Sequence, residues 1–298
     1  MTPVVAVVGP TATGKSALGI ALAQALGGEV VNTDSMQLYR GMDVGTAKLA
    51  ADERDGVPHH LLDIWDITEA ASVAAYQRLA RACVDGLRAA GRVPVLVGGS
   101  GLYIRAVLDR LEFPGTDPAL RAELERELAA AGPGVLHARL AELDPAAAAA
   151  ILPSNGRRIV RALEVIALTG APFTATLPGP EPFYDAVQIG IDVDPAVLDH
   201  RVDVRVDHMW AAGLVDEVRA LEKVGLRDGP TASRALGYAQ VLRFFDGDLD
   251  EAQARAHTQL ATRRFVRRQR SWFRRDERVH WLDAARPDLV DAALALIR

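Results

Sequence analysis

GPTATGKS, residues 9–16, is the stretch that decides the fold: Gly9, Pro10, Thr11, Ala12, Thr13, Gly14, Lys15 and Ser16. It fits the phosphate-binding pattern G-x-x-x-x-G-K-[ST], with an apolar run (3–8) directly before it and a helix-like run (17–26) directly after it. Such a loop curls its backbone N–H groups around phosphate oxygens, and the next helix points unpaired amides at the same anion. Lys15 adds a positive charge, and the Ser16 hydroxyl is a ligand for Mg²⁺. The pattern predicts a site for a diphosphate or a triphosphate.

The composition is that of a chain with a full hydrophobic core. The 298 residues are 49% hydrophobic, which suits one large domain or one domain with an insertion. The formal net charge is -5, so any contact with nucleic acid must come from a local basic patch. Cys83 is the single cysteine, which excludes an intramolecular disulfide and fits a reducing cytoplasm. No apolar run approaches the roughly 18 residues of a membrane span. We expect a cytoplasmic protein with no membrane partner.

A second predicted strand carries an acidic residue just past its end. The segment 29–32 follows the first helix, and Asp34 lies two residues beyond it. Strand, helix and strand make a βαβ unit, so we predict a parallel sheet with helices on its faces. Ligands bind at the carboxyl ends of the strands in such sheets. Asp34 is therefore expected on the same rim as the phosphate loop.

A third apolar run, 93–97, ends in Gly98, Gly99 and Ser100. An ordinary phosphate-loop ATPase or GTPase holds its Mg²⁺ with an aspartate at such a strand tip. A tip of glycines and a serine leaves room for a ligand group instead, which argues against nucleotide hydrolysis. The later run 187–194 can also supply a carboxylate at a strand end, so this point stays open.

Residues 113–185 show helical periods and no strand. Asp117 and Asp144 each precede a proline, as an N-cap precedes the first turn of a helix. We predict an α/β core at 1–112 and 186–298 with an all-helical insertion at 113–185. Three arginines on neighbouring turns of one inserted helix form either a solvated basic face or a contact with a phosphate backbone: Arg157, Arg158 and Arg161.

The segment 199–221 is expected to be one helix that carries Arg205. If Arg205 reaches the phosphate loop, it places a second cation on a leaving group; a surface salt bridge is the competing account. The following segment mixes Arg234, Gly237 and Tyr238 before another helix.

Eight arginines lie within sixteen positions near the carboxyl end. On a helix they occupy an arc of roughly 160°, and Phe265, Trp272 and Phe273 fall on the other side. Solvated faces usually mix charges, so a stripe of one sign favours a polyanionic partner, with nucleic acid as the natural candidate. The stripe consists of Arg263, Arg264, Arg267, Arg268, Arg270, Arg274, Arg275 and Arg278.

Taken together, these motifs resemble the tRNA dimethylallyltransferases, also called tRNA isopentenyltransferases. The resemblance runs from residue 4 to about 283 and is carried by GPTATGKS at 9–16, DS at 34–35, YRGMDVGTAK at 39–48, PHHLLD at 58–63, LVGG at 96–99 and RALEV at 161–165. It implies a fold like that of the P-loop NTPases and transfer of a dimethylallyl group from dimethylallyl diphosphate to tRNA. The acceptor it implies is N6 of the adenosine immediately 3′ of the anticodon, which becomes N6-isopentenyladenosine with release of diphosphate.

The resemblance also implies roles for individual residues. Asp34 is expected to accept the proton of the adenine amine, and a positioned base contributes about 10²- to 10⁴-fold in rate. Arg205 and Ser100 complete the expected catalytic set, the phosphate loop holds the diphosphate, and Ser16 holds Mg²⁺. Ser100 stands where the family usually has threonine, and Ala239 stands where many members have a basic residue. The expected tRNA contacts are Asp34, Ser35, Met36, Gln37, Arg157, Arg158, Arg161, Arg234, Gly237, Tyr238, Arg264 and Arg268.

Three alternatives remain beside this reading. A P-loop small-molecule kinase predicts ATP turnover and a strand-tip carboxylate for Mg²⁺. An adenylate isopentenyltransferase acts on a free nucleotide and leaves the arginine stripe and the insertion unexplained. An RNA-binding regulator without chemistry does not need Asp34. The preferred reading has dimethylallyl diphosphate and the tRNA anticodon stem-loop as partners, Mg²⁺ as cofactor and a monomeric protein, with ATP binding left open.

Overall fold

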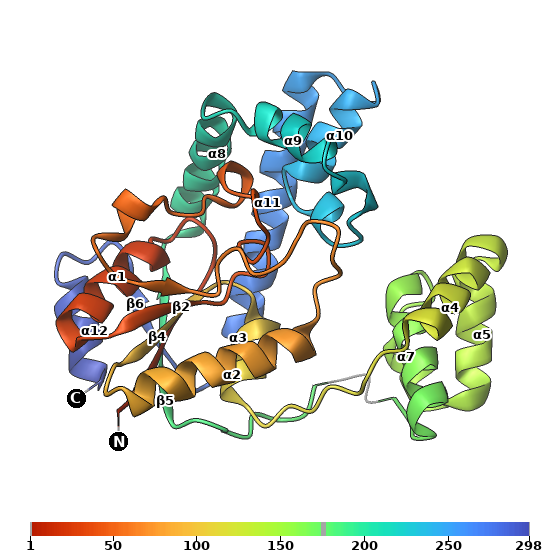
Figure 1. The fold of residues 1–298 in the computed structure, drawn as a ribbon, viewed down its shortest axis with the longest axis horizontal. Coiled ribbons are helices and arrows are strands. Elements are labelled where there is room, and N and C mark those ends of the chain that lie inside the picture. Colours follow the sequence, from red (N-terminus) through yellow and green to blue (C-terminus); the bar gives the residue numbers. More distant parts are fainter. Residues whose placement is uncertain (1, 174–176, 298) are drawn as a thin grey trace. The chain divides into compact units, whose positions relative to one another are not determined.

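Six strands pair in one parallel sheet (Figure 1). The computed structural model describes residues 2–173 and 177–297. Hydrogen bonds connect the strands in the order β3-β2-β4-β1-β5-β6, and all these pairings are parallel. The predicted α/β class is confirmed. The strands are β1 (Val4–Val8), β2 (Glu29–Asn32), β3 (His59–His60), β4 (Pro94–Gly98), β5 (Ala186–Asp192) and β6 (Val279–Asp283).

The central strands β1 and β4 are continuous apolar runs because helices cover both faces of the sheet. Val5 and Val7 of β1 face a core shared with α1 (Lys15–Leu26) and α12 (Leu289–Ile297). The alternate residues of β1 face a second core shared with α2 (Val73–Ala89) and α3 (Gly101–Leu108). None of the helices within 2–173 and 177–297 is long and apolar enough to cross a membrane.

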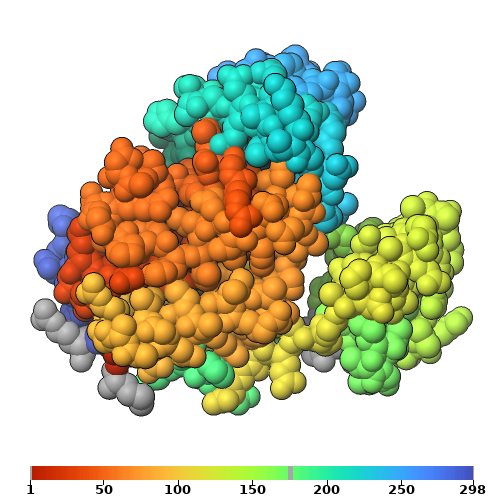
Figure 2. Space-filling view, in the orientation of Figure 1, coloured from red at the N-terminus to blue at the C-terminus, as the bar shows by residue number. Residues whose placement is uncertain are grey.

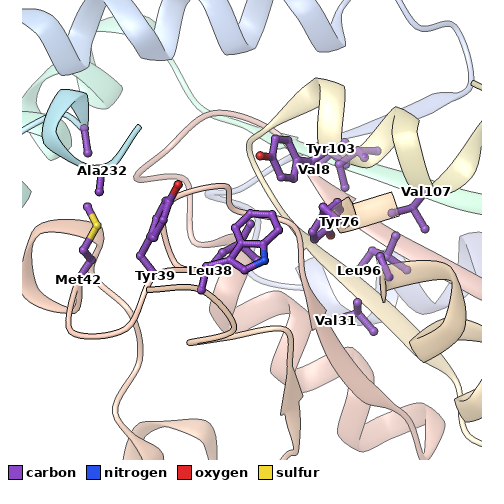
Figure 3. Close-up of a cluster of buried hydrophobic side chains, with 14 of the residues drawn as sticks. Val8, Val31, Leu38, Tyr39, Met42, Tyr76, Leu96, Tyr103, Val107 and Ala232 are labelled. Carbon is purple, nitrogen blue, oxygen red and sulfur yellow. The ribbon is translucent and has the colours of Figure 1, made fainter. Parts of the chain in front are cut away.

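The loop after β2 is part of the second core. Leu38, Tyr39 and Met42 are fully buried, and Figure 3 shows them in one cluster with Tyr76 and Tyr103. The Tyr76 hydroxyl donates to the backbone carbonyl of the last β2 residue at 2.8 Å. This packing fixes the chain on both sides of Asp34.

The predicted single helix over 199–221 is two helices. Gly213 has a φ of 95° and separates α8 (Pro195–Ala211) from α9 (Leu214–Glu222). This left-handed conformation is one that glycine adopts without steric cost, and it ends the first helix. The remaining helices of this part are α10 (Tyr238–Phe245) and α11 (Glu251–Phe273).

Residues 111–181 form a separate compact unit, and the rest of the chain forms the other. These bounds lie two and four residues before the expected 113 and 185. The elements in its described residues are helices, and their N-caps agree with the sequence signals. The Asp117 side chain accepts from the amides of Ala119 and Leu120, and that of Asp144 accepts from the amide of Ala147. Its helices are α4 (Pro118–Ala131), α5 (Pro133–Leu143), α6 (Pro145–Ala150) and α7 (Gly156–Thr169).

Candidate active site

The phosphate loop curls as its sequence predicts. Gly9 and Gly14 have φ values of 134° and 92°, and Ala12 between them also has a positive φ, 67°. A Cβ at position 9 would lie 2.4 Å from the carbonyl oxygen of Ile191, so only glycine fits there. Thr13 donates to the Pro10 carbonyl at 2.8 Å and closes the loop. The loop therefore presents its backbone to a cavity of about 360 Å³, the phosphate-loop cavity.

Two cations face this cavity, and neither forms an ion pair within the residues that the structure describes. Burial first, and the charge of Arg205 second, lower the pKa of Lys15 to about 7, although Asp34 acts in the opposite direction. Burial also lowers the pKa of Arg205. Within the described parts of the chain, neither side chain forms an ion pair with a carboxylate: Lys15 Nζ donates to the Pro10 carbonyl at 2.5 Å, and Arg205 donates to the Thr46 carbonyl at 3.1 Å. Two neighbouring cations that form no ion pair make a site suited to an anion.

Asp34 is held on the rim by its neighbours. Its Oδ1 accepts from the amide of Met36 at 2.9 Å. The buried side chain of Asn32, at the end of β2, accepts from the Asp34 amide at 2.9 Å and donates to the Asp34 carbonyl at 3.1 Å. Sequence reasoning did not single out Asn32; a lone amide at the tip of an apolar strand was the available signal. These hydrogen bonds fix the backbone of Asp34, and its carboxylate faces the two cations.

Ser100 connects the tip of β4 to the segment that carries Asp34. Its hydroxyl accepts from the Ser35 amide at 3.3 Å and contacts the Ser35 hydroxyl at 3.3 Å. Gln269, on α11, makes a similar bridge: it accepts from the Thr11 amide at 2.9 Å and donates to the Gly99 carbonyl at 3.0 Å. Gln269 is only 5% exposed and was also missed, because it lies among arginines in the sequence.

A second cavity of about 320 Å³, the adjoining cavity, shares Thr11, Asp34 and Arg205 with the first. The two cavities therefore meet at one carboxylate and one guanidinium. Most of the predicted tRNA contacts outside the insertion line one cavity or the other: Gln37 lines the phosphate-loop cavity, and Ser35, Met36, Arg234, Tyr238 and Arg268 line the adjoining cavity. The predicted catalytic residue Ser100 also lines the adjoining cavity. A small planar acceptor in the second cavity would face a phosphate-bound group in the first.

Tyr238 and Gly237 lie in the interior. Tyr238 is 0% exposed, and its hydroxyl donates to Glu217 at 2.5 Å. Gly237 is also buried and has a φ of 87°, and its amide donates to the Gln240 side chain. These positions support the cavity wall rather than form a surface.

The arginine stripe is mostly neutralised, which corrects the expectation of one unpaired face. Helix α11 ends at Phe273, so Arg274, Arg275 and Arg278 lie beyond its last residue. Aspartates at helical spacing on α8 face the arginines one turn apart on α11, and Asp192 and Asp109 take others. The pairs are Arg263–Asp203, Arg267–Asp199, Arg270–Asp192, Arg274–Asp192 and Arg278–Asp109.

The remaining arginines form a second line. Within residues 2–173 and 177–297, Arg264, Arg268 and Arg275 have no carboxylate partner, and all three are exposed. Trp272, expected on the packed side, is 36% exposed. Positions 264, 268 and 272 recur every four residues on α11, so the Arg264 and Arg268 side chains and the Trp272 indole share a face.

In the helical unit, Arg161 serves the fold. Glu164 is fully buried and accepts from Arg121, Thr116 and Arg161. Burial alone would raise the pKa of Glu164, but these hydrogen bonds outweigh it and lower the pKa to about 2. Arg161 also donates to the carbonyls of Pro114 and Gly115. Arg157 and Arg158 are exposed on the same helix.

The residues around the phosphate-loop cavity offer one protein ligand for a metal ion, the Ser16 hydroxyl. Among the described residues, no three His, Cys, Asp or Glu side chains gather as a metal site. Asp192, the carboxylate at the end of β5, is bound by Arg270 at 2.6 Å and by Arg274 at 3.1 Å, so it is not available as a ligand. The exposed Ser16 hydroxyl lies in the phosphate-loop cavity. This fits Mg²⁺ held by few protein atoms and mainly by phosphate oxygens.

The chain is similar to known proteins over nearly its whole length. The model of the IPP transferase family matches residues 37–276. The tRNA dimethylallyltransferases of Salinispora arenicola and Thermobifida fusca are 71% and 67% identical to it; these matches cover 99% and 100% of this chain and 86% and 95% of the relatives. The crystal structure of the tRNA isopentenylpyrophosphate transferase from Bacillus halodurans is 42% identical, with a TM-score of 0.73, and the match covers 99% of this chain and 94% of that one.

A eukaryotic dimethylallyltransferase acting on tRNA has the same fold. It is 24% identical, with a TM-score of 0.82, over 99% of this chain and 78% of that one.

Proposed function

This chain belongs to the IPP transferase family, and on that premise we propose how its site transfers a dimethylallyl group to tRNA. The protein is a tRNA dimethylallyltransferase, and its donor is dimethylallyl diphosphate. The acceptor we propose is N6 of the adenosine immediately 3′ of the anticodon. The observation that carries this mechanism is that the phosphate-loop cavity and the adjoining cavity meet at Asp34 and Arg205.

The donor diphosphate fits the phosphate-loop cavity. Backbone amides of the loop, the Lys15 ammonium and the Arg205 guanidinium all face the cavity and carry positive charge or dipole. Because the guanidinium and the ammonium form no ion pair with a carboxylate among the described residues, their charge is available to the leaving group as its own charge grows. This is stabilisation in the transition state, and one such donor is typically worth about 10²- to 10³-fold in rate.

The acceptor amine needs a base. The N6 lone pair of adenine is delocalised into the ring, so the amine is a weak nucleophile. In the transfer, N6 forms a bond to C1 of the dimethylallyl group, and the C1–O bond breaks with its electron pair leaving on diphosphate. The Asp34 carboxylate accepts the N6 proton. An adenine must leave its base stack to enter the adjoining cavity.

We propose Mg²⁺ as the cofactor, with Ser16 as its protein ligand. When bound, the ion neutralises charge on the diphosphate oxygens. A small-molecule kinase is not favoured, since the strand-end carboxylate that it would need, Asp192, is engaged by Arg270 and Arg274.

The anticodon stem-loop is the proposed tRNA region. Arg264 and Arg268, together with Arg157 and Arg158 of the helical unit, are exposed and would contact phosphates. A monomer in the cytoplasm remains our proposal. The cytoplasmic location is supported by the single cysteine, Cys83, which leaves no intramolecular disulfide and fits a reducing compartment.

Prenyl transfer from dimethylallyl diphosphate to an unmodified tRNA, with Mg²⁺ present, tests the mechanism. The tRNA has adenosine 3′ of the anticodon, and a matched tRNA with guanosine there is the control. We expect labelled prenyl groups on the first tRNA alone. The Asp34→Ala variant should lose transfer but still bind tRNA; loss of binding as well would remove Asp34 from the role of base. ATP consumption without prenyl transfer would overturn the function.

A further inference from the structure

We propose that Glu217, on α9, is a positioning residue for prenyl transfer, because its carboxylate holds the loop whose Thr46 carbonyl orients Arg205. The inference rests on the proposed function, in which Arg205 contacts the leaving diphosphate.

The Glu217 carboxylate accepts hydrogen bonds from three consecutive backbone amides. Oε2 accepts from Asp43 at 3.0 Å and from Val44 at 2.7 Å, and Oε1 accepts from Gly45 at 3.1 Å. These amides open the short 3₁₀ helix η1 (Val44–Thr46), whose first N–H groups have no partner inside the helix. Hydrogen bonds to a charged carboxylate are roughly twice as strong as neutral ones. One side chain thus ties the start of this loop to α9.

A buried ring supports the same loop from below. The Tyr238 hydroxyl donates to Oε1 of Glu217 at 2.5 Å. A Cβ at position 45 would lie 2.5 Å from a Tyr238 ring carbon, so the loop lies flat on the ring and only glycine fits. Figure 2 shows the teal surface of the segment that contains α9 against the orange surface of the segment that contains the loop, in agreement with the contacts between α9 and η1. The loop therefore has one position relative to α9 and α10.

The loop then meets the site through one carbonyl. Thr46 O accepts from Arg205 at 3.1 Å and from Gln37 at 3.2 Å. Within residues 2–173 and 177–297, the bond to Thr46 is the one hydrogen bond of the Arg205 side chain. The direction of the guanidinium consequently depends on where the loop places this carbonyl. Glu217 itself lines neither cavity, so it acts through the loop.

The Glu217→Gln variant tests the proposal. The amide has a single acceptor oxygen for three amides, and its NH₂ group opposes the others. We expect kcat at saturating donor and tRNA to fall by about 10²-fold, as small misplacements near a reacting centre do, while the donor KM changes by less than about threefold. Asp216→Asn is the matched control: the neighbouring carboxylate forms a surface pair with Arg219, and its loss should leave kcat within about twofold.

Combination with Arg205→Ala shows whether Glu217 acts through Arg205. Adding Glu217→Gln to Arg205→Ala should cost less than about twofold more, since the positioned group is already gone. Losses that multiply would overturn the proposal, and so would full kcat in Glu217→Gln. If Glu217→Gln does not fold, Gly45→Ala, which pushes the same loop off the Tyr238 ring, should give the same kcat loss and the same non-additivity.

Amide hydrogen exchange separates this proposal from the proposed function. If the wild-type protein transfers no prenyl group, the proposed function is wrong, but the hydrogen bonds from the amides of residues 43–45 to Glu217 can still be measured. Exchange at residues 43–46 should be at least tenfold faster in Glu217→Gln and unchanged in Asp216→Asn. Equal exchange in both variants would show that Glu217 does not hold the loop at residues 43–46.

Discussion

Arginines in this protein fall into two groups that differ in what surrounds them. Arg161 pairs with Glu164 on its own helix, and Arg270 and Arg278 each pair with a carboxylate on another element. Arg205, Arg264 and Arg268 have no such partner in the described parts of the chain. The charge of a paired arginine stabilises the fold, whereas the charge of an unpaired arginine is available to bind a ligand. The comparison predicts that variants of the first group lose stability and variants of the second lose function.

The largest effect is expected at Arg205. The Arg205→Ala variant should lower kcat by about 10³-fold, the upper range for removal of one transition-state donor, with little change in Tm. The measurement is single-turnover prenyl transfer beside a thermal melt. Arg201→Ala, one turn earlier on α8 and exposed, is the control and should stay within about threefold. A Tm loss that accounts for the inactivity of Arg205→Ala would place Arg205 in the paired group.

Glu164 should show the opposite pattern. Glu164→Gln leaves Arg121 and Arg161 with a neutral partner in a buried site, and we expect the free energy of unfolding of the helical unit to fall by about 3 kcal/mol. Glu127→Gln, which alters a surface pair with Arg139, should cost less than about 1 kcal/mol. Denaturant unfolding followed by circular dichroism measures both. A similar small loss in both variants would contradict the buried pairing.

The same carboxylate gives this unit an acid limit. The folded pKa of Glu164, about 2, lies below its ordinary value of 4.5. Its contribution to stability is therefore complete above about pH 4.5 and is lost as the pH falls toward 2. In Glu164→Gln that part of the acid dependence should be absent, which unfolding curves at several pH values would show.

The two lines of arginine on α11 allow a matched test of tRNA binding. The Arg264→Ala/Arg268→Ala double variant should weaken tRNA binding by about tenfold or more. The slope of log K against log salt should become shallower by the amount expected for about two lost phosphate contacts. Arg263→Ala with Arg267→Ala removes the same charge from paired neighbours and should change binding less. Filter binding at several salt concentrations measures both. Equal losses in the two double variants would mean that pairing does not decide which arginines bind RNA.

The smallest expected effect concerns Lys15. Its pKa of about 7 means that the charged form declines from half to about a tenth between pH 7 and pH 8. A diphosphate favours the ammonium, so donor affinity should fall by about fivefold over this interval, and binding at pH 7.5 should take up a proton. Calorimetry in two buffers of different ionisation enthalpy measures the uptake. A donor affinity that is flat with pH would show that Lys15 stays charged in the free enzyme.

Local patterns were sufficient for much of the fold. The phosphate loop, the apolar strands and the aspartate N-caps of the insertion depend on neighbours in sequence, and the structure places them as predicted. One error came from long-range packing: the break at Gly213 was missed because the apolar spacing continues across it. The two-residue strand His59–His60, for which no prediction was made, pairs with the edge of β2.

The rim that carries Asp34, Ser100 and the phosphate loop follows from the sequence, because parallel strands bring their carboxyl ends together whatever the details of packing. The tertiary structure decided which charges are free. Asp203 and Arg263 are 60 residues apart, and Glu217 meets Gly45 across 172, so no local spacing connects them. Charge is a property of a residue, but its compensation is a property of the residues that the fold places beside it.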